Sequence, residues 1–147
     1  MTYIEEYYQF LLKNPDKACH KVLTVYKKLV QDIYNPKQVS FFNKITEENE
    51  THTFIFNEKR GNKPIEFIEK FCKHSKGKWA GQPVQLELFQ KAFIQALFGF
   101  VDKDTEIRKY KKGALFIGRK NGKSTMDSAG FHLISLSTIR AAMLHGA

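Results

Sequence analysis

The chain has little cysteine, little proline and no long run of apolar residues, and each shortage excludes a class of protein. Two cysteines and four prolines occur in 147 residues. Two cysteines are too few for a disulfide framework, so we expect buried thiols in a reducing compartment. No stretch approaches the roughly 18 consecutive apolar residues of a membrane span, and the first residues lack the features of a signal peptide. These absences predict a soluble intracellular protein.

Acidic residues are also few, with 15 Asp and Glu against 24 Lys and Arg, so the formal net charge is +9. A positive field attracts nucleic acids, nucleotides and other polyanions without selecting among them. Because the lysines are spread along the chain, a solvated lysine-rich surface explains them equally well. Apolar residues make up 42% of the chain, which is enough for the core of one ordinary domain.

Apolar residues recur at helical spacing in several parts of the chain. The spacing predicts helices over residues 2–13, 15–34, 63–73 and 84–98. Asn14 is expected to cap the second helix, with Pro15 in its first turn. Two short β-prone runs, 39–42 and 53–56, flank an acidic stretch, and the pattern leaves their assignment open. Residues 101–112 are expected to form a charged linker.

One segment carries a chemical signature. Between Gly113 and Thr125, a short apolar run, a tight loop and the expected start of a helix follow one another. Residues 114–117 have the pattern of a buried parallel strand. The loop closes on Gly122-Lys123-Ser124, as a Walker A phosphate loop does. There Gly122 lets backbone N–H groups point at a phosphate, Lys123 reaches the β- and γ-phosphates, and the Ser124 hydroxyl binds Mg²⁺.

The loop departs from the full Walker A pattern at its first glycine. Ile117 stands where that glycine is expected, and Gly118 is displaced by one position. Arg119 and Lys120 raise the positive potential of the loop. Spacing alone therefore leaves a lysine-rich turn as an alternative to phosphate binding.

The loop Gly118-Arg-Lys-Asn-Gly-Lys-Ser-Thr125 resembles the variant Walker A of tailed-bacteriophage terminase large subunits, in which an Arg precedes the Gly-Lys-Ser/Thr and the first Gly is commonly replaced. Phe71-Cys-Lys-His-Ser-Lys-Gly-Lys-Trp-Ala-Gly-Gln-Pro83, followed by 86–91 and by Phe98-Gly99, is similar to the segment that leads into the ATPase core of that family. The resemblance covers roughly residues 14–128. It implies an ATPase that drives viral DNA into a procapsid and is followed by a nuclease.

The resemblance also implies roles for single residues. Lys123 would bind the phosphates, Ser124 or Thr125 the Mg²⁺, and Arg119 would stand near the γ-phosphate as a transition-state or coupling residue. Gln90 would contact the adenine, unless it is a solvent-facing residue of an amphipathic helix. The implied nucleotide-binding set is Gly118, Arg119, Lys120, Asn121, Gly122, Lys123, Ser124, Thr125 and Gln90, with Arg119 and Lys123 as its catalytic members.

The expected fold class is α/β. A mainly helical region over 1–83 precedes the start of a P-loop ATPase domain over 84–147, which supplies its first strand, phosphate loop and helix. ATP hydrolysis needs an acidic residue on a second strand, and after Lys123 the chain offers only Asp127, on the same expected helix. We therefore expect a chain truncated before the Walker B strand and the nuclease, which binds ATP weakly and does not turn it over. The run 130–147 is unlike the family and indicates a disrupted prophage gene.

Partners and location are implied by the resemblance alone. They are double-stranded viral DNA, the terminase small subunit and the portal, in the cytoplasm of a bacterial host, with a homo-oligomer compatible with the family and no membrane. Two other interpretations stay open. The first is another P-loop NTPase, helicase-like or kinase-like. The second is a small basic nucleic-acid-binding protein without a nucleotide site.

Overall fold

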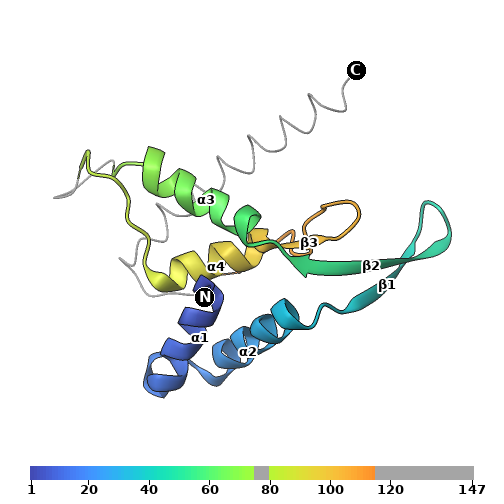
Figure 1. Cartoon of the computed structure of the whole chain (residues 1–147), viewed down its shortest axis with the longest axis horizontal. Coiled ribbons are helices and arrows are strands. Elements are labelled where there is room, and N and C mark those ends of the chain that lie inside the picture. Colours follow the sequence, from blue (N-terminus) through green and yellow to red (C-terminus); the bar gives the residue numbers. More distant parts are fainter. Residues whose placement is uncertain (75–79, 115–147) are drawn as a thin grey trace.

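The computed structural model describes residues 1–74 and 80–114. Two helices, a β-hairpin, two further helices and a short strand follow one another along this part of the chain (Figure 1). The bounds are α1 Tyr3–Lys13, a 3-10 turn Pro15–Lys17, α2 His20–Tyr34, β1 Gln38–Asn43, β2 Glu48–Phe56, α3 Glu58–Phe71, α4 Leu88–Gly99 and β3 Phe100–Asp102. The described part is thus mixed α and β.

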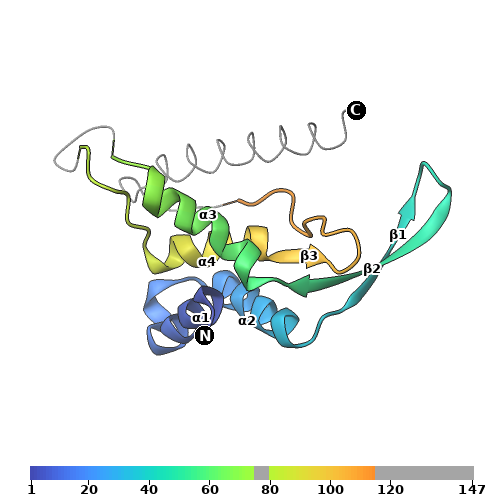
Figure 2. The ribbon, with the colours of Figure 1, turned by 45° about the horizontal axis from the view of Figure 1, so that its top comes forward.

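Helix α4 lies at the centre of the helices, with α3 on one side and α1 and α2 on the other (Figure 2). Ile94 belongs to an apolar cluster with residues of α3, whereas Ala92 belongs to a second cluster with residues of α1, α2 and β3. A helix that packs on two sides is apolar nearly all round, as α4 is. No helix in the described ranges is long and apolar enough to cross a membrane.

The backbones of α3 and α4 approach closely at Gly61. A Cβ atom added there would lie 2.9 Å from Gln95 Cγ and 3.3 Å from Gly99 Cα. Gln95 is fully buried; its Oε1 accepts the backbone N–H of Ile4 at 3.2 Å, and its Nε2 donates to Asn62 Oδ1 at 2.6 Å. One amide side chain therefore joins α1, α3 and α4, and the contact requires glycine at position 61.

The sheet is antiparallel, in the order β1-β2-β3. Strand β1 pairs with residues 48–53 of β2, and β3 pairs with residues 54–56. The base of the hairpin is therefore held by β3, while its outer part projects beyond the helices (Figure 1). The two β-prone runs whose assignment the sequence left open are the two arms of this hairpin.

Helix α2 begins later than predicted. Asn14 makes no side-chain capping bond to the residues after it; instead its Nδ2 donates to the Phe10 carbonyl at 2.9 Å and closes α1. Pro15 starts a 3-10 turn that ends at Ala18, whose backbone is extended. The predicted continuous helix from Pro15 is therefore wrong, and α2 starts at His20.

Helix α3 begins five residues earlier than predicted, because the Asn57 side chain caps it by accepting the Arg60 N–H at 3.1 Å. Helix α4 begins at Leu88 rather than residue 84. Val84 and Leu86 are buried against α3 in an extended segment, so they share the core without sharing the helix. The sequence prediction therefore wrongly placed these two buried residues in the helix that follows them.

Two smaller expectations are also corrected. The start of the predicted charged linker is the buried strand β3, in which Val101 and Asp102 are each 2% exposed. Of the two cysteines, Cys19 is exposed and Cys72 is half-buried, so the expectation of two buried thiols is wrong.

Candidate nucleotide site and the segment that leads to it

Of the residues that the sequence assigns to a nucleotide site, Gln90 is the one within the described ranges. The others lie outside them, as does most of the predicted strand 114–117: Gly118, Arg119, Lys120, Asn121, Gly122, Lys123, Ser124 and Thr125. Their roles stay predictions.

Gln90 is 4% exposed, so the expectation of a solvent-facing glutamine is wrong. Its Oε1 accepts the backbone N–H of Glu87 at 2.9 Å in a capping box that begins α4. Such a box satisfies N–H groups that the first helical turn leaves without partners. The side chain thus fixes where α4 starts, and a contact between Gln90 and adenine stays a prediction.

The segment before the predicted loop turns back along α4. After β3 the chain reverses, with the Asp102 N–H donating to the Ile107 carbonyl at 2.8 Å, and Lys109 N–H then bonds to the Phe100 carbonyl at 2.9 Å. A Cβ on Gly113 would lie 2.9 Å from the ring of Phe93. Residues 108–113 therefore run from the C-terminal end of α4 toward its N-terminal end, as the returning chain in Figure 2 shows.

Lys109 anchors this segment to α2. Its Nζ lies 3.1 Å from Oδ2 of Asp32, a residue 4% exposed. The same ammonium lies 5.3–5.8 Å from the ring centroids of Phe54, Phe100 and Tyr110. Ammonium groups at this distance from aromatic faces are attracted to them. Lys109 therefore holds the returning chain through its ion pair with Asp32 and through the attraction of its ammonium group to the three rings.

Arg108 attaches the same segment to α4. Its guanidinium carbon lies 4.7 Å from the centroid of the Phe98 ring, and its Nη1 is buried without a hydrogen-bond partner in the described structure. Burial lowers the pKa of Arg108, and the positive charge of Arg60 lowers it further. The side chain nevertheless stays charged near neutral pH, since arginine ionises far above it.

A histidine between two carboxylates joins the hairpin to β3. His52 Nδ1 bonds to Asp102, and its Nε2 lies 3.4 Å from Glu50. The bond to Asp102 raises the pKa of His52, and the contact with Glu50 adds to this. The pKa of Asp102 is lowered, first by the Asp104 N–H and then by His52. The raised pKa of His52 and the lowered pKa of Asp102 both favour the charged forms of the two side chains, which make the ion pair.

We expect the His52 pair to make stability depend on pH. Because the folded-state pKa of His52 is raised above 6.5, its contribution is complete below that pH and is lost as the pH rises through the folded value. The free energy of unfolding should therefore fall as the pH rises above 6.5, and His52→Gln should flatten this slope. Urea denaturation of both proteins at several pH values measures it; equal slopes would rule out the pair as the cause.

Sequence analysis missed the anchors of the returning chain. Asp32 and Lys109 are 77 residues apart, and His52 and Asp102 are 50 apart. No local pattern connects partners at such separations. The one available signal was the alternation of basic and aromatic residues around Tyr110, which indicates packing as readily as ligand binding.

Comparison with known proteins adds an independent observation. Over 66 residues the chain is 44% identical to the terminase large subunit of Enterobacteria phage HK97. The match covers 44% of this chain and 12% of the phage protein, so the chain corresponds to a small part of that relative. No family model matches, and no solved structure does. Over this stretch the chain is similar to part of a bacteriophage terminase large subunit.

Proposed function

We propose that the chain belongs to the ATPase region of a phage terminase large subunit and that its loop 118–125 binds the phosphates of ATP. The observation that carries the proposal is the 44% identity to the HK97 terminase large subunit. The loop agrees with it in chemistry, because a lysine and a hydroxyl directly follow a glycine, as the β- and γ-phosphates and Mg²⁺ require.

The course of the returning chain supports the same site. Gly113 lies beside the ring of Phe93. Within α4, Phe93 follows Gln90 by less than one helical turn. A strand that continued from Gly113 would advance about 3.3 Å per residue, so the four residues 114–117 would carry the loop past the N-terminal end of α4. Such a course would bring the proposed phosphate loop toward the end of α4 that carries Gln90, as the proposed contact with adenine requires.

In the intact protein, we propose, ATP hydrolysis drives viral DNA into a capsid. Hydrolysis requires a carboxylate that activates water, and the single acidic residue that follows Lys123 in this sequence is Asp127. This chain by itself is therefore proposed to bind ATP without turning it over. Steady ATPase activity that Lys123→Ala abolishes would contradict that part of the proposal.

Lys123→Ala tests the nucleotide site. Because a lysine at this position contacts the phosphates directly, we expect the affinity for Mg²⁺-ATP to fall at least about tenfold, which is about 1.4 kcal/mol. Isothermal titration calorimetry on the 147-residue chain measures it. Lys112→Ala is the matched control, because it removes the same charge from an exposed position outside the loop. Equal losses in both variants would show that net charge, not a site, holds the nucleotide.

The same variants distinguish a nucleotide site from the alternative of a basic nucleic-acid-binding protein. A protein of that kind binds duplex DNA in a strongly salt-dependent way. Its DNA affinity would not respond to ATP or to Lys123→Ala beyond the loss of one charge. If DNA binds in this manner and Mg²⁺-ATP does not bind at all, the nucleotide-site proposal is wrong.

A further inference from the structure

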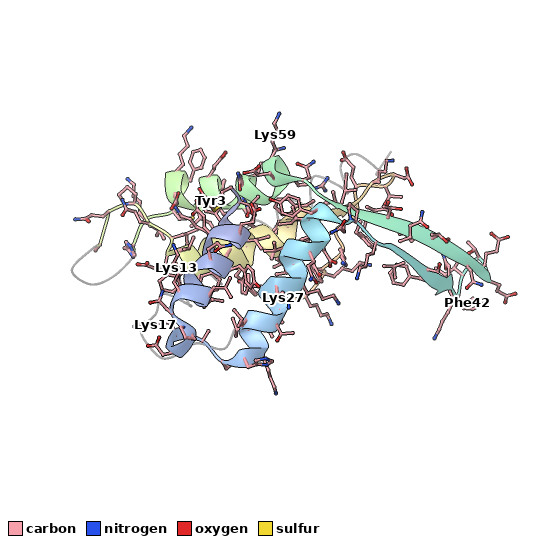
Figure 3. The ribbon with its side chains drawn as sticks, turned by 60° about the horizontal axis from the view of Figure 1, so that its bottom comes forward. Tyr3, Lys13, Lys17, Lys27, Phe42 and Lys59 are labelled. Atoms are coloured by element: carbon pink, nitrogen blue, oxygen red, sulfur yellow. The ribbon has the colours of Figure 1, made fainter. Side chains whose placement is uncertain are left out.

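Lys109 is held by groups from three different elements. Its Nζ lies 3.1 Å from Oδ2 of Asp32, in the last turn of α2. The same ammonium lies 5.3–5.8 Å from three ring centroids, those of Phe54 in β2, Phe100 in β3 and the neighbouring Tyr110. Helix α2 lies alongside α1 and reaches the base of the hairpin at this end (Figure 3). The position of one lysine therefore depends on α2, β2 and β3 together.

Lys109 stands close to the proposed phosphate loop in the sequence. Residues 110–117 separate it from the loop, and no residue among those described after Lys109 makes an ion pair. The backbone N–H of Lys109 donates to the Phe100 carbonyl at 2.9 Å, so its main chain is held as well as its side chain. Lys109 therefore fixes the point from which the chain proceeds to the loop.

A buried ion pair contributes little to stability by itself. Removing two charges from water costs free energy that their attraction only partly returns, and apolar side chains of similar size often serve stability equally well. The pair instead specifies one position for the lysine. Asp32 is 4% exposed, so a shift of Lys109 would leave a buried carboxylate without its opposite charge. The contact thus favours one placement of the returning chain over others.

We propose that Lys109 and Asp32 are positioning residues of the nucleotide site, which couple the affinity of the loop for Mg²⁺-ATP to the packing of α2. This inference rests on the proposed function of the loop 118–125. A loop that binds phosphates through several backbone N–H groups must hold them all in place at once. Ordering a loop on binding costs free energy, so a loop whose base is fixed beforehand binds more tightly.

Three variants test the coupling: Asp32→Ala, Lys109→Met and the double variant with both changes. Isothermal titration calorimetry on the 147-residue chain measures their affinity for Mg²⁺-ATP. Each single variant breaks the same contact, so we expect each to weaken binding at least about fivefold, the lower end of typical coupling between sites. The double variant should bind as weakly as either single variant, because the same contact is lost in all three.

The opposite charges of the two residues make this pattern specific. ATP is an anion, so if only the electrostatic field mattered, Asp32→Ala would strengthen its binding and Lys109→Met would weaken it. In the double variant the two effects would cancel. Positioning instead predicts weaker binding in all three variants. Asp16→Ala is the matched control, because it removes the same charge as Asp32→Ala from an exposed residue of the 3-10 turn, and it should not weaken binding.

Loss of stability needs a control of its own. Leu11 is 1% exposed, so Leu11→Ala should lower the free energy of unfolding at least as much as Asp32→Ala. Leu11→Ala should nevertheless keep the ATP affinity of the unchanged protein. Circular dichroism checks that each variant is folded during the titration, and Lys109→Met alone decides the question if Asp32→Ala does not fold.

Amide hydrogen exchange gives a second readout of the coupling. In Asp32→Ala, saturating Mg²⁺-ATP should slow exchange in residues 108–113 more than it does in the unchanged protein. The reason is that binding must then order a segment that the ion pair no longer holds. Weaker binding without this extra protection would overturn the positioning role.

The remaining outcomes separate the two proposals. If the unchanged protein does not bind Mg²⁺-ATP, or if Lys123→Ala binds it equally tightly, the proposed function is wrong and the coupling with it. If binding depends on Lys123 but Asp32→Ala and Lys109→Met bind as tightly as the unchanged protein, only the positioning role is wrong. That role is also wrong if Asp32→Ala strengthens binding, or if Leu11→Ala weakens it to the same extent.

Discussion

Replacing Gly61 with leucine is expected to lower the free energy of unfolding by about 3 kcal/mol. The reason is the close contact of α3 with α4, where even a methyl group would lie 2.9 Å from Gln95 Cγ and 3.3 Å from the backbone at Gly99. A leucine must push the helices apart and strain the hydrogen bonds of Gln95 to α1 and α3. Urea denaturation followed by circular dichroism measures the loss.

Lys63→Leu is the control for this prediction, because it places the same side chain on an exposed face of the same helix. Surface substitutions of that kind change stability by less than about 0.5 kcal/mol. A similar small effect for Gly61→Leu would mean that α3 and α4 do not pack as described.

Removing the carboxylate of Asp32 is expected to cost about 2 kcal/mol. Breaking a buried ion pair leaves one charge without its partner, which costs about 3–5 kcal/mol, and the partial exposure of Lys109 reduces that cost. Asp32→Ala should also speed amide hydrogen exchange in residues 108–113, since Lys109 anchors that segment to α2. Denaturation and exchange measurements on the same variant give both values.

A double-mutant cycle shows whether the ion pair is the cause. Lys109→Met removes the charge but keeps an apolar stem among the aromatic rings. If the pair matters, the double variant Asp32→Ala, Lys109→Met should lose less stability than the single variants Asp32→Ala and Lys109→Met added together. Strict additivity would show that the two residues act separately.

The parts of the fold that sequence predicts are those fixed by neighbouring residues. Helix α1 was predicted because apolar residues recur at helical spacing from Ile4 to Leu12, and the structure buries Ile4 and Leu11 and adds a capping box between Thr2 and Glu5. Helix α2 was misplaced at its start because Asn14 bonds backward to Phe10, a choice between two local partners that the sequence does not decide. Local sequence signals therefore predict the existence of a helix more reliably than its first residue.

The hairpin escaped a clear prediction for a different reason. Strand prediction relies on alternation of buried and exposed residues, and the outer part of the hairpin is exposed on both faces. Its base is positioned by β3, some fifty residues later. The same separation hides the anchors of the returning chain, so sequence predicted the phosphate loop by its motif but not the contacts that lead the chain to it.

The most direct measurement is amide hydrogen exchange on the 147-residue chain with and without Mg²⁺-ATP. The proposed site binds phosphates through backbone N–H groups of residues 118–125. Mg²⁺-ATP should therefore slow exchange in peptides that cover this loop, and Lys123→Ala should remove the protection. Unchanged exchange in these peptides at an ATP concentration that saturates binding would contradict the central claim.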